Sequence, residues 1–336
     1  MKKFLIIQTA FLGDVILATS IAEKLHQFFP TAEIDFLLRK GNESIFENHP
    51  YVNEVIVLDK KNNKWKNLFS IASLVRKKKY HSIVNLHRFG SSGFITWYSG
   101  AKNKIGFDKN PFSFCYTRKV RHEIGSGTHE IERNHKLIEP FTDKTPAKPN
   151  LYPSEKDFEA LKKYSHEKYI CIAPASVWFT KQFPKEKWIE LIGAVEENIA
   201  VYLIGSSSDY MLCDEIRSKV TRTNGSPGWA YQKSKVENLS GKLSILQTAA
   251  LMKGAKMNYA NDSAPAHIAS AMNAPVTEIF CSTVPAFGFG PLSDNSRIIQ
   301  TKENLDCRPC GLHGYHECPE GHFKCATAID IKEILT

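Results

Sequence analysis

Residues 4–30 read FLIIQTAFLGDVILATSIAEKLHQFFP, and their pattern is the clearest indication of the fold class. Its first four residues are apolar and predict a buried strand, and apolar residues at helical spacing from Leu17 to Phe28 predict an amphipathic helix. The charge of Asp14 interrupts a run that would otherwise resemble the apolar part of a secretory signal. We therefore interpret the segment as strand, turn and helix rather than as a leader, which predicts a cytoplasmic protein.

The same alternation continues along most of the chain. Amphipathic runs separate eight short apolar runs, a pattern typical of a parallel sheet covered by helices. The predicted strands are Phe4–Gln8, Ile34–Leu38, Val55–Leu58, Ile83–Leu86, Tyr169–Ala173, Val201–Gly205, Met257–Asn261 and Val276–Cys281.

Thr145–Pro153 marks the domain boundary, because it carries three prolines in nine residues and has neither a helical nor a strand period. We predict an α/β protein with two Rossmann-like, doubly wound domains, residues 1–150 and 151–336, facing a central cleft. Ligands of such domains bind at the carboxyl ends of the strands.

Composition excludes several classes of protein. The charged fraction of 24% and the mean hydropathy of −0.30 fit neither a disordered chain nor a polytopic membrane protein. Residues 1–150 hold 24 Lys and Arg against 14 Asp and Glu, a net of +10, whereas residues 151–336 hold 20 against 21. This asymmetry predicts an anionic partner for the first domain, with solvated surface lysines as the alternative.

The first motif, Gln8–Val15, directly follows the first predicted strand. Gly13 permits a tight turn or a close backbone approach, and Asp14 follows it where the helix begins. The residues leave two interpretations of Asp14 open: a helix cap, or a general base at the carboxyl end of a strand.

The second motif, Ala173–Trp188, runs from a strand through a loop to a helix. Ser176 and Thr180 offer hydroxyl groups, and Lys181 offers a positive charge suited to phosphate oxygens. An ordinary solvent-exposed lysine is the alternative.

The third motif, Tyr259–Ala271, is the most specific. Asp262 and Ser263 follow a strand, and Pro265 stands where a helix favours proline. The amides of the first helical turn and the Ser263 hydroxyl predict an anion site for a diphosphate. The alternative is an ordinary helix cap with His267 packed beside it.

Together the motifs resemble glycosyltransferase family 9, the lipopolysaccharide heptosyltransferases. Gly13–Thr19 is similar to the opening Gly-Asp segment of the family, Pro174–Pro184 to its lysine loop, Gly241–Leu246 to its Gly-Lys-Thr segment and Asn261–Ala269 to its Asn-Asp-Ser-Gly-Pro block. The chain departs from the family pattern at three positions: Gln8 replaces arginine, Ser20 replaces proline and Ala264 replaces glycine.

The resemblance implies a GT-B architecture with an acceptor-binding N-terminal domain and a nucleotide-sugar-binding C-terminal domain. It implies inverting, metal-independent transfer of heptose from ADP-heptose to a lipopolysaccharide inner-core or related glycolipid acceptor. Asp14 would take the proton of the acceptor hydroxyl, and Lys181 would stabilise the leaving diphosphate. No two aspartates stand two residues apart, the spacing of a metal clamp, and no cofactor is expected.

Two sets of binding residues are predicted. The donor residues are Ser176, Thr180, Asp209 at the ribose, Asp262, Ser263, Ala264 and His267. The acceptor residues are Gly13, Arg88 and, from the basic cluster around Trp65, Lys60, Lys61, Lys64 and Lys66. An anionic glycolipid acceptor implies peripheral association with the inner face of the inner membrane and no nucleic-acid partner.

Four cysteines gather near the C-terminus, at Cys307, Cys310, Cys318 and Cys325, with three histidines between them. The spacing leaves open a structural zinc site, one or two disulfides, or reduced and packed thiols. Three alternatives to the heptosyltransferase function are a transferase of another nucleotide-sugar, a sugar-nucleotide epimerase of the same architecture, and a nucleic-acid-binding protein. The weakly basic tail disfavours the last.

Overall fold

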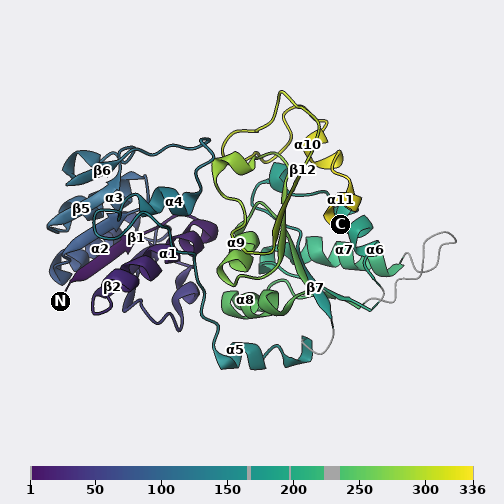
Figure 1. The fold of residues 1–336 in the computed structure, drawn as a ribbon, viewed down its shortest axis with the longest axis horizontal. Coiled ribbons are helices and arrows are strands. Elements are labelled where there is room, and N and C mark those ends of the chain that lie inside the picture. The colour runs from purple at the N-terminus through teal and green to yellow at the C-terminus, as the bar shows by residue number, and fades with distance from the viewer. Residues whose placement is uncertain (1, 165–167, 197, 223–234, 336) are drawn as a thin grey trace. The chain divides into compact units, whose positions relative to one another are not determined.

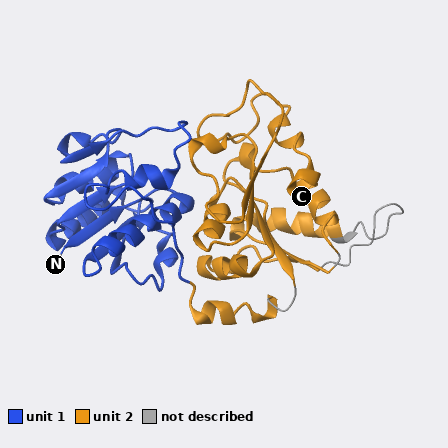
Figure 2. Cartoon of the chain, in the orientation of Figure 1, with its two compact units in different colours: residues 1–152 blue, residues 153–336 orange. Residues whose placement is uncertain are grey.

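The computed structural model describes residues 2–164, 168–196, 198–222 and 235–335. The chain forms two compact units, Met1–Tyr152 (unit 1) and Pro153–Thr336 (unit 2), and Figure 2 colours them separately. Their junction lies within the proline-rich stretch Thr145–Pro153.

Unit 1 contains a six-stranded sheet in the order β3-β2-β1-β4-β5-β6, in which every pair of neighbours is parallel. Its strands are β1 (Lys3–Ile7), β2 (Glu33–Arg39), β3 (Glu54–Leu58), β4 (Ser82–Asn85), β5 (Asn103–Phe107) and β6 (Arg118–Val120). Its helices are α1 (Leu12–Phe28), α2 (Lys64–Lys78), α3 (Gly90–Tyr98) and α4 (Glu130–His135) (Figure 1).

Unit 2 repeats the plan with a second parallel sheet in the order β12-β11-β10-β7-β8-β9. Its strands are β7 (Tyr169–Ala173), β8 (Ala200–Leu203), β9 (Val236–Asn238), β10 (Met257–Asn261), β11 (Val276–Phe280) and β12 (Ser296–Gln300). Its helices are α5 (Glu155–Glu159), α6 (Lys185–Gly193), α7 (Tyr210–Arg222), α8 (Ile245–Gly254), α9 (Ala264–Ala271), α10 (Lys324–Thr327) and α11 (Ile331–Leu335).

Both faces of the unit 1 sheet are buried, which explains why its strands are almost continuously apolar. Leu5 packs in one cluster with Leu68 of α2 and Ile95 of α3. Phe4 and Ile6, which alternate with it and point to the opposite face, are buried as well. Burying one such side chain contributes about 1.5–3 kcal/mol, so the two-sided core dominates the stability of the unit.

In unit 2, Trp188 and Ile192 of α6 pack in one cluster with Ile172 of β7 and Val201 of β8. The eight predicted strands are all present, and the α/β class with two Rossmann-like domains is confirmed. In each sheet the second and third strands add on one side of the first strand, and the fourth to sixth strands add on its other side. The first strand therefore lies beside a topological switch point, between β1 and β4 in unit 1 and between β7 and β10 in unit 2.

No helix in the described part of the chain combines the length and the apolar character needed to cross a membrane.

Candidate active site

A chain of hydrogen bonds joins three strand ends of unit 1. The Lys60 ammonium donates to the Thr9 carbonyl at 2.8 Å and to the Thr9 hydroxyl at 3.0 Å. The Thr9 hydroxyl lies 3.0 Å from Nδ1 of His87. Because an ammonium group only donates, the hydroxyl accepts from Lys60 and can donate its own proton to Nδ1. Neutral His87 then carries its proton on Nε2.

Positive charge surrounds this chain of hydrogen bonds. Burial, followed by the charges of Lys60, Arg88 and Arg39, lowers the pKa of His87 to about 3. Burial, followed by Arg39 and Lys64, lowers the pKa of Lys60 to about 8. His87 is therefore neutral at pH 7, whereas the four cations that influence these two groups create an electropositive edge of the sheet.

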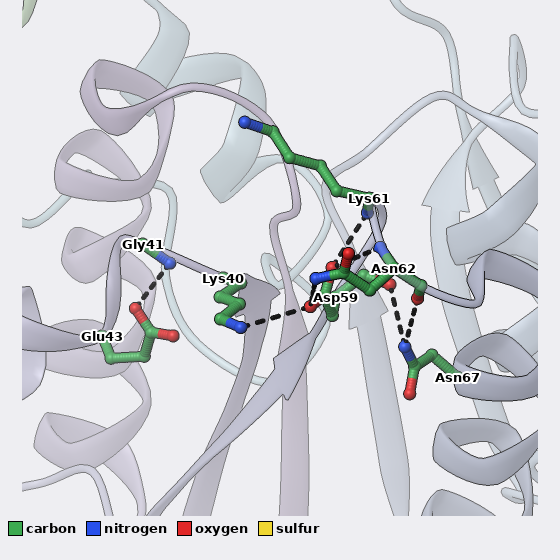
Figure 3. Close-up of polar contacts among 7 residues, drawn as sticks. All are labelled: Lys40, Gly41, Glu43, Asp59, Lys61, Asn62 and Asn67. Carbon is green, nitrogen blue, oxygen red and sulfur yellow. Dashed lines mark hydrogen bonds and ion pairs between the residues drawn. The ribbon is translucent and has the colours of Figure 1, made fainter.

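The loop that carries Lys60 is held by its neighbour Asp59, at the centre of Figure 3. Asp59 Oδ1 accepts from the backbone amides of Lys61 at 2.9 Å and Asn62 at 3.0 Å, and its Oδ2 accepts from Lys40 at 3.3 Å. These hydrogen bonds hold the pKa of Asp59 well below its usual range, and the bond from the Asn62 backbone amide contributes most. Figure 3 shows the Lys61 ammonium extending away from Asp59.

The predicted acceptor residues thus differ in their surroundings. Lys60 and Arg88 are half-buried near the switch point, whereas Lys61, Lys64 and Lys66 are exposed.

Asp14 is the third residue of α1 and half-buried, and the N-cap position belongs to Phe11. Asp14 is therefore not the N-cap residue, although the helix N-terminus stabilises its carboxylate. Gly13 is helical and does not adopt the left-handed conformation, so it forms no tight turn, and the alternative of a close backbone approach stays a prediction.

A buried ion pair lies close enough to Asp14 for the charge of Asp14 to affect it. Glu130 and Arg133, both buried on α4, are joined from Nε to Oε2 at 2.8 Å. Burial raises the pKa of Glu130 to about 6; Arg133 opposes this shift and Asp14 adds to it. The helix that carries Asp14, α1, packs against α4.

Lys181 and Asp262 form the central ion pair of unit 2. Lys181 follows β7 and Asp262 follows β10, so the two residues flank the switch point. Lys181 Nζ lies 2.7 Å from Asp262 Oδ2, and both side chains are largely buried. The Thr283 hydroxyl donates to the same oxygen at 2.5 Å. Desolvation strengthens electrostatic interactions, so a charged ligand at this position would interact strongly with the pair.

Asn261, which begins the family-like segment Asn261–Ala269 but was given no role of its own, holds the lysine loop against β10. Its buried amide accepts from the Phe183 backbone at 2.9 Å and donates to the Pro174 carbonyl at 2.9 Å. A polar residue at the end of a strand indicated that Asn261 could have a role, but the sequence does not show which loop the residue contacts.

The N-terminus of α9 begins beside Asp262. Ser263 is the N-cap residue, but its hydroxyl donates to the Asn261 carbonyl at 3.2 Å and makes no capping bond to the helix. Ala264 is helical, so the replacement of the glycine typical of the family causes no backbone strain here. His267 is buried on the second turn, and its ring lies 6.4 Å from that of Phe289.

Two of the predicted donor residues have structural partners. The buried Thr180 hydroxyl accepts from the Tyr315 backbone at 2.8 Å and from Ser282 at 3.0 Å. Asp209 Oδ2 accepts from the Ser206 backbone amide and hydroxyl, both at 2.7 Å, and so has a capping role. Ser176 is half-buried, and its carbonyl accepts from Gln182 at 2.7 Å.

Comparison with known proteins decides the family. The family model "Glycosyltransferase family 9 (heptosyltransferase)" matches residues 68–316, most of the chain and parts of both units. The chain belongs to glycosyltransferase family 9. Its two parallel six-stranded sheets are the Rossmann-like domains of a GT-B glycosyltransferase. Asp14 lies outside the matched range.

Individual relatives are similar to this chain along most of their length. Lipopolysaccharide heptosyltransferase 3 of Escherichia coli K12 is 27% identical over 312 residues, covering 86% of this chain and 84% of that protein. Among solved structures, a family 9 glycosyl transferase of Veillonella parvula has a TM-score of 0.83 at 20% identity, covering 99% of this chain and 95% of that one. ADP-heptose lipopolysaccharide heptosyltransferase II of E. coli has a TM-score of 0.76 at 20% identity, with both chains fully covered.

The cysteine-rich segment of this family 9 glycosyltransferase packs on its lysine loop. Gly314 has a φ of +79°, and a Cβ there would lie 2.7 Å from the Thr180 hydroxyl and 3.1 Å from Lys181 Cγ. The rings of Trp178 and His316 lie 4.7 Å apart. The segment therefore helps to position Lys181, a contact that the sequence analysis missed.

The cysteines of the glycosyltransferase are free thiols. The Sγ of Cys307 lies 3.9 Å from Nε2 of His322. Burial raises the pKa of Cys325 to about 12, which favours the neutral thiol. Within the described ranges no group of three or more histidines, cysteines or acids is arranged to hold a metal, so the zinc site weighed from the sequence is not supported.

Glu278 is an acid that the sequence analysis did not identify. It lies within β11, fully buried, and neither carboxyl oxygen has a hydrogen-bond partner among the described residues. Burial, followed by the charge of Asp262, raises its pKa well above the usual value, which favours the protonated form.

Proposed function

We propose that this glycosyltransferase transfers heptose from ADP-heptose to an inner-core lipopolysaccharide or related glycolipid acceptor, with inversion and without a metal ion. The observation that carries the proposal is the buried ion pair of Lys181 and Asp262 beside the N-terminus of α9. Family membership favours transfer over epimerisation. The relatives named as lipopolysaccharide heptosyltransferases support heptose and this acceptor class.

Unit 2 binds the donor in this proposal. The diphosphate lies against Lys181 and the first amides of α9, where positive charge and helix polarity favour an anion. A solved structure of an E. coli heptosyltransferase contains ADP, which supports an adenine nucleotide. Asp262 holds the lysine until the leaving diphosphate gains charge, and Lys181 then stabilises that charge. Ser263 and His267 line the same pocket.

Unit 1 binds the acceptor. Asp14 removes the proton of the attacking hydroxyl, which then attacks the anomeric carbon opposite the departing diphosphate and inverts its configuration. Lys60 and Arg88, at the electropositive sheet edge, bind the carboxylates or phosphates of the acceptor. Lys61, Lys64 and Lys66 are exposed and attract an anionic membrane at the inner face of the inner membrane.

The test is the product. Purified protein is incubated with a deacylated inner-core acceptor and ADP-heptose, UDP-glucose or GDP-mannose in EDTA, and the products are analysed by mass spectrometry. We expect the mass of one heptose to be added only with ADP-heptose, and calorimetry to rank ADP above UDP and GDP. A hexose product, or a strict requirement for magnesium, would contradict the assignment.

A further inference from the structure

An exposed layer of aromatic rings covers one side of unit 1. Large fractions of Trp65 (66%) and Phe69 (57%) on α2, Trp97 (47%) on α3 and Phe114 (69%) after β5 are exposed. We call these four residues, together with the half-buried Phe94 and Phe112, the aromatic face.

Three segments contribute to the aromatic face, and five of its six rings are linked by ring contacts; the sixth, Trp65, lies one helical turn before Phe69 on α2. The Phe94 ring lies 5.3 Å from that of Phe69, 5.9 Å from Trp97 and 6.1 Å from Phe112. Phe112 in turn lies 5.9 Å from Phe114. The face is therefore one continuous apolar surface rather than a set of scattered side chains.

Of these rings only Phe94 packs against the core cluster of unit 1, and the exposed rings do not belong to that cluster. The buried stripe of α2 is Leu68, Ala72 and Val75, and Ile95 fills the corresponding position on α3. Soluble monomers rarely expose a continuous apolar patch of this kind, and a patch rimmed by polar residues indicates a protein or membrane contact.

Charge identifies the class of partner. Residues 60–107 contain eleven Lys and Arg and not one Asp or Glu. Lys64 and Lys66 flank Trp65, and Arg76 lies 5.0 Å from the ring of Tyr98 beside the aromatic face. A second copy of the chain would bring like charges together, whereas an anionic bilayer combines negative headgroups with an apolar interior. Tryptophan and lysine are typical of proteins that bind at that interface.

We propose that the aromatic face inserts into the headgroup region of an anionic bilayer, with the surrounding lysines and arginines on lipid phosphates. This deepens the peripheral membrane association within the proposed function. Electrostatic attraction of exposed lysines fades with salt, whereas burial of rings does not. The binding should therefore have a salt-sensitive part and a salt-resistant part.

A vesicle flotation assay measures the salt-sensitive and the salt-resistant part of the binding separately. The full chain is mixed with vesicles of equal phosphatidylcholine and phosphatidylglycerol, at low and at high salt, without donor or acceptor. We expect Phe69→Ser with Trp97→Ser to weaken binding roughly tenfold or more at both salt concentrations, since two buried rings are lost. Lys64→Gln with Lys66→Gln should weaken it mainly at low salt. Phe158→Ser, an exposed phenylalanine of unit 2, is the matched control and should bind like the wild type.

Insertion itself has a spectroscopic signature. Brominated phosphatidylcholine quenches tryptophan that enters the bilayer, so Trp65 and Trp97 should be quenched on binding. The conservative Trp65→Phe with Trp97→Phe variant should bind and lose most of that quenching. Absence of quenching in the wild type would overturn the proposal. So would a wild-type dimer that Phe69→Ser with Trp97→Ser converts to a monomer without changing vesicle binding.

The outcome is independent of the heptosyltransferase assignment, because the vesicle assays contain neither substrate. Conversely, the serine variant should transfer heptose to a deacylated, water-soluble acceptor at the wild-type rate. Loss of that activity with an intact circular dichroism spectrum would place the aromatic face in acceptor binding and contradict a membrane role.

Discussion

Lys181 Nζ and Asp262 Oδ2 lie 2.7 Å apart, and Thr283 donates to the same oxygen. Lys181 is thus held by the Asp262 carboxylate, and a bound diphosphate would have to share the lysine with that carboxylate. Asp262 orients the cation and at the same time offsets part of its charge.

Replacing Lys181 by alanine should lower heptose transfer about 10²–10³-fold, because the charge stabilises the leaving diphosphate most in the transition state. Lys181→Arg should retain more activity than Lys181→Ala. If Asp262 acts only through the lysine, Asp262→Asn should add little in the Lys181→Ala background. Steady-state kinetics of the four variants measure this coupling, and fully additive losses would give Asp262 an independent role.

A substitution of Gly314 should disturb the lysine loop as well as the cysteine-rich segment that contains it. Gly314→Ala places a Cβ against Thr180 and Lys181, whereas Gly321→Ala has the same left-handed strain with no atom within 4 Å. Both variants should lose about 1 kcal/mol of stability from strain. Only Gly314→Ala should weaken ADP-heptose binding, measured by calorimetry. Equal binding by the two variants would show that the packing does not reach the donor site.

Lys60 should make acceptor recognition pH-dependent. Its pKa is about 8, so the ammonium present at pH 7 is lost as the pH rises through that value. The KM for an anionic acceptor should therefore rise between pH 7 and 9. Lys60→Arg stays charged over this range and should show a flat profile. A wild-type profile without a transition near pH 8 would remove Lys60 from acceptor binding.

Glu278 should destabilise unit 2 increasingly at higher pH. The unfolded carboxyl ionises near pH 4.5, whereas the folded group keeps its proton until well above that value. Between these two pKa values the folded state binds more protons, so stability falls by up to about 1.4 kcal/mol per pH unit. Glu278→Gln, which resembles the protonated form, should gain stability over the wild type as pH rises. Chemical denaturation at pH 6, 7 and 8 measures the difference, and a constant difference would show that Glu278 is ionised in the folded state.

The strands were predictable because a sheet covered on both faces needs apolar residues at every position. The missed strands include β6, Arg118–Val120, and β9, Val236–Asn238, which are edge strands of three mostly polar residues. Their pairing depends on the neighbouring strand rather than on local composition. Val195, which fits the helical period of α6, lies beyond the helix end at Gly193.

The sequence assigned Lys181 and Asp262 to one candidate site because they follow strands whose carboxyl ends meet, and the structure pairs the two side chains, whereas their roles stay predictions. Contacts between distant segments were not: the packing of Gly314 on Thr180, 134 positions apart in sequence, leaves no local pattern. Glu278 was missed because a single acid inside an apolar run predicts only a strand. Asp209 has a sequence context that fits ribose binding, but its bonds to Ser206 give it a local capping role.

The role of Asp14 as the catalytic base is tested by the single-turnover rate of Asp14→Asn. Asparagine keeps the shape of the side chain in the first turn of α1 but cannot take a proton. ADP-heptose affinity, which we assign to unit 2, should remain at the wild-type value by calorimetry, and Glu47→Gln, an exposed acid of unit 1, should behave as the wild type throughout. We predict a rate of heptose transfer about 10²–10⁴-fold lower, the usual contribution of a general base. A rate near that of the wild type would contradict the assignment of Asp14 as the catalytic base.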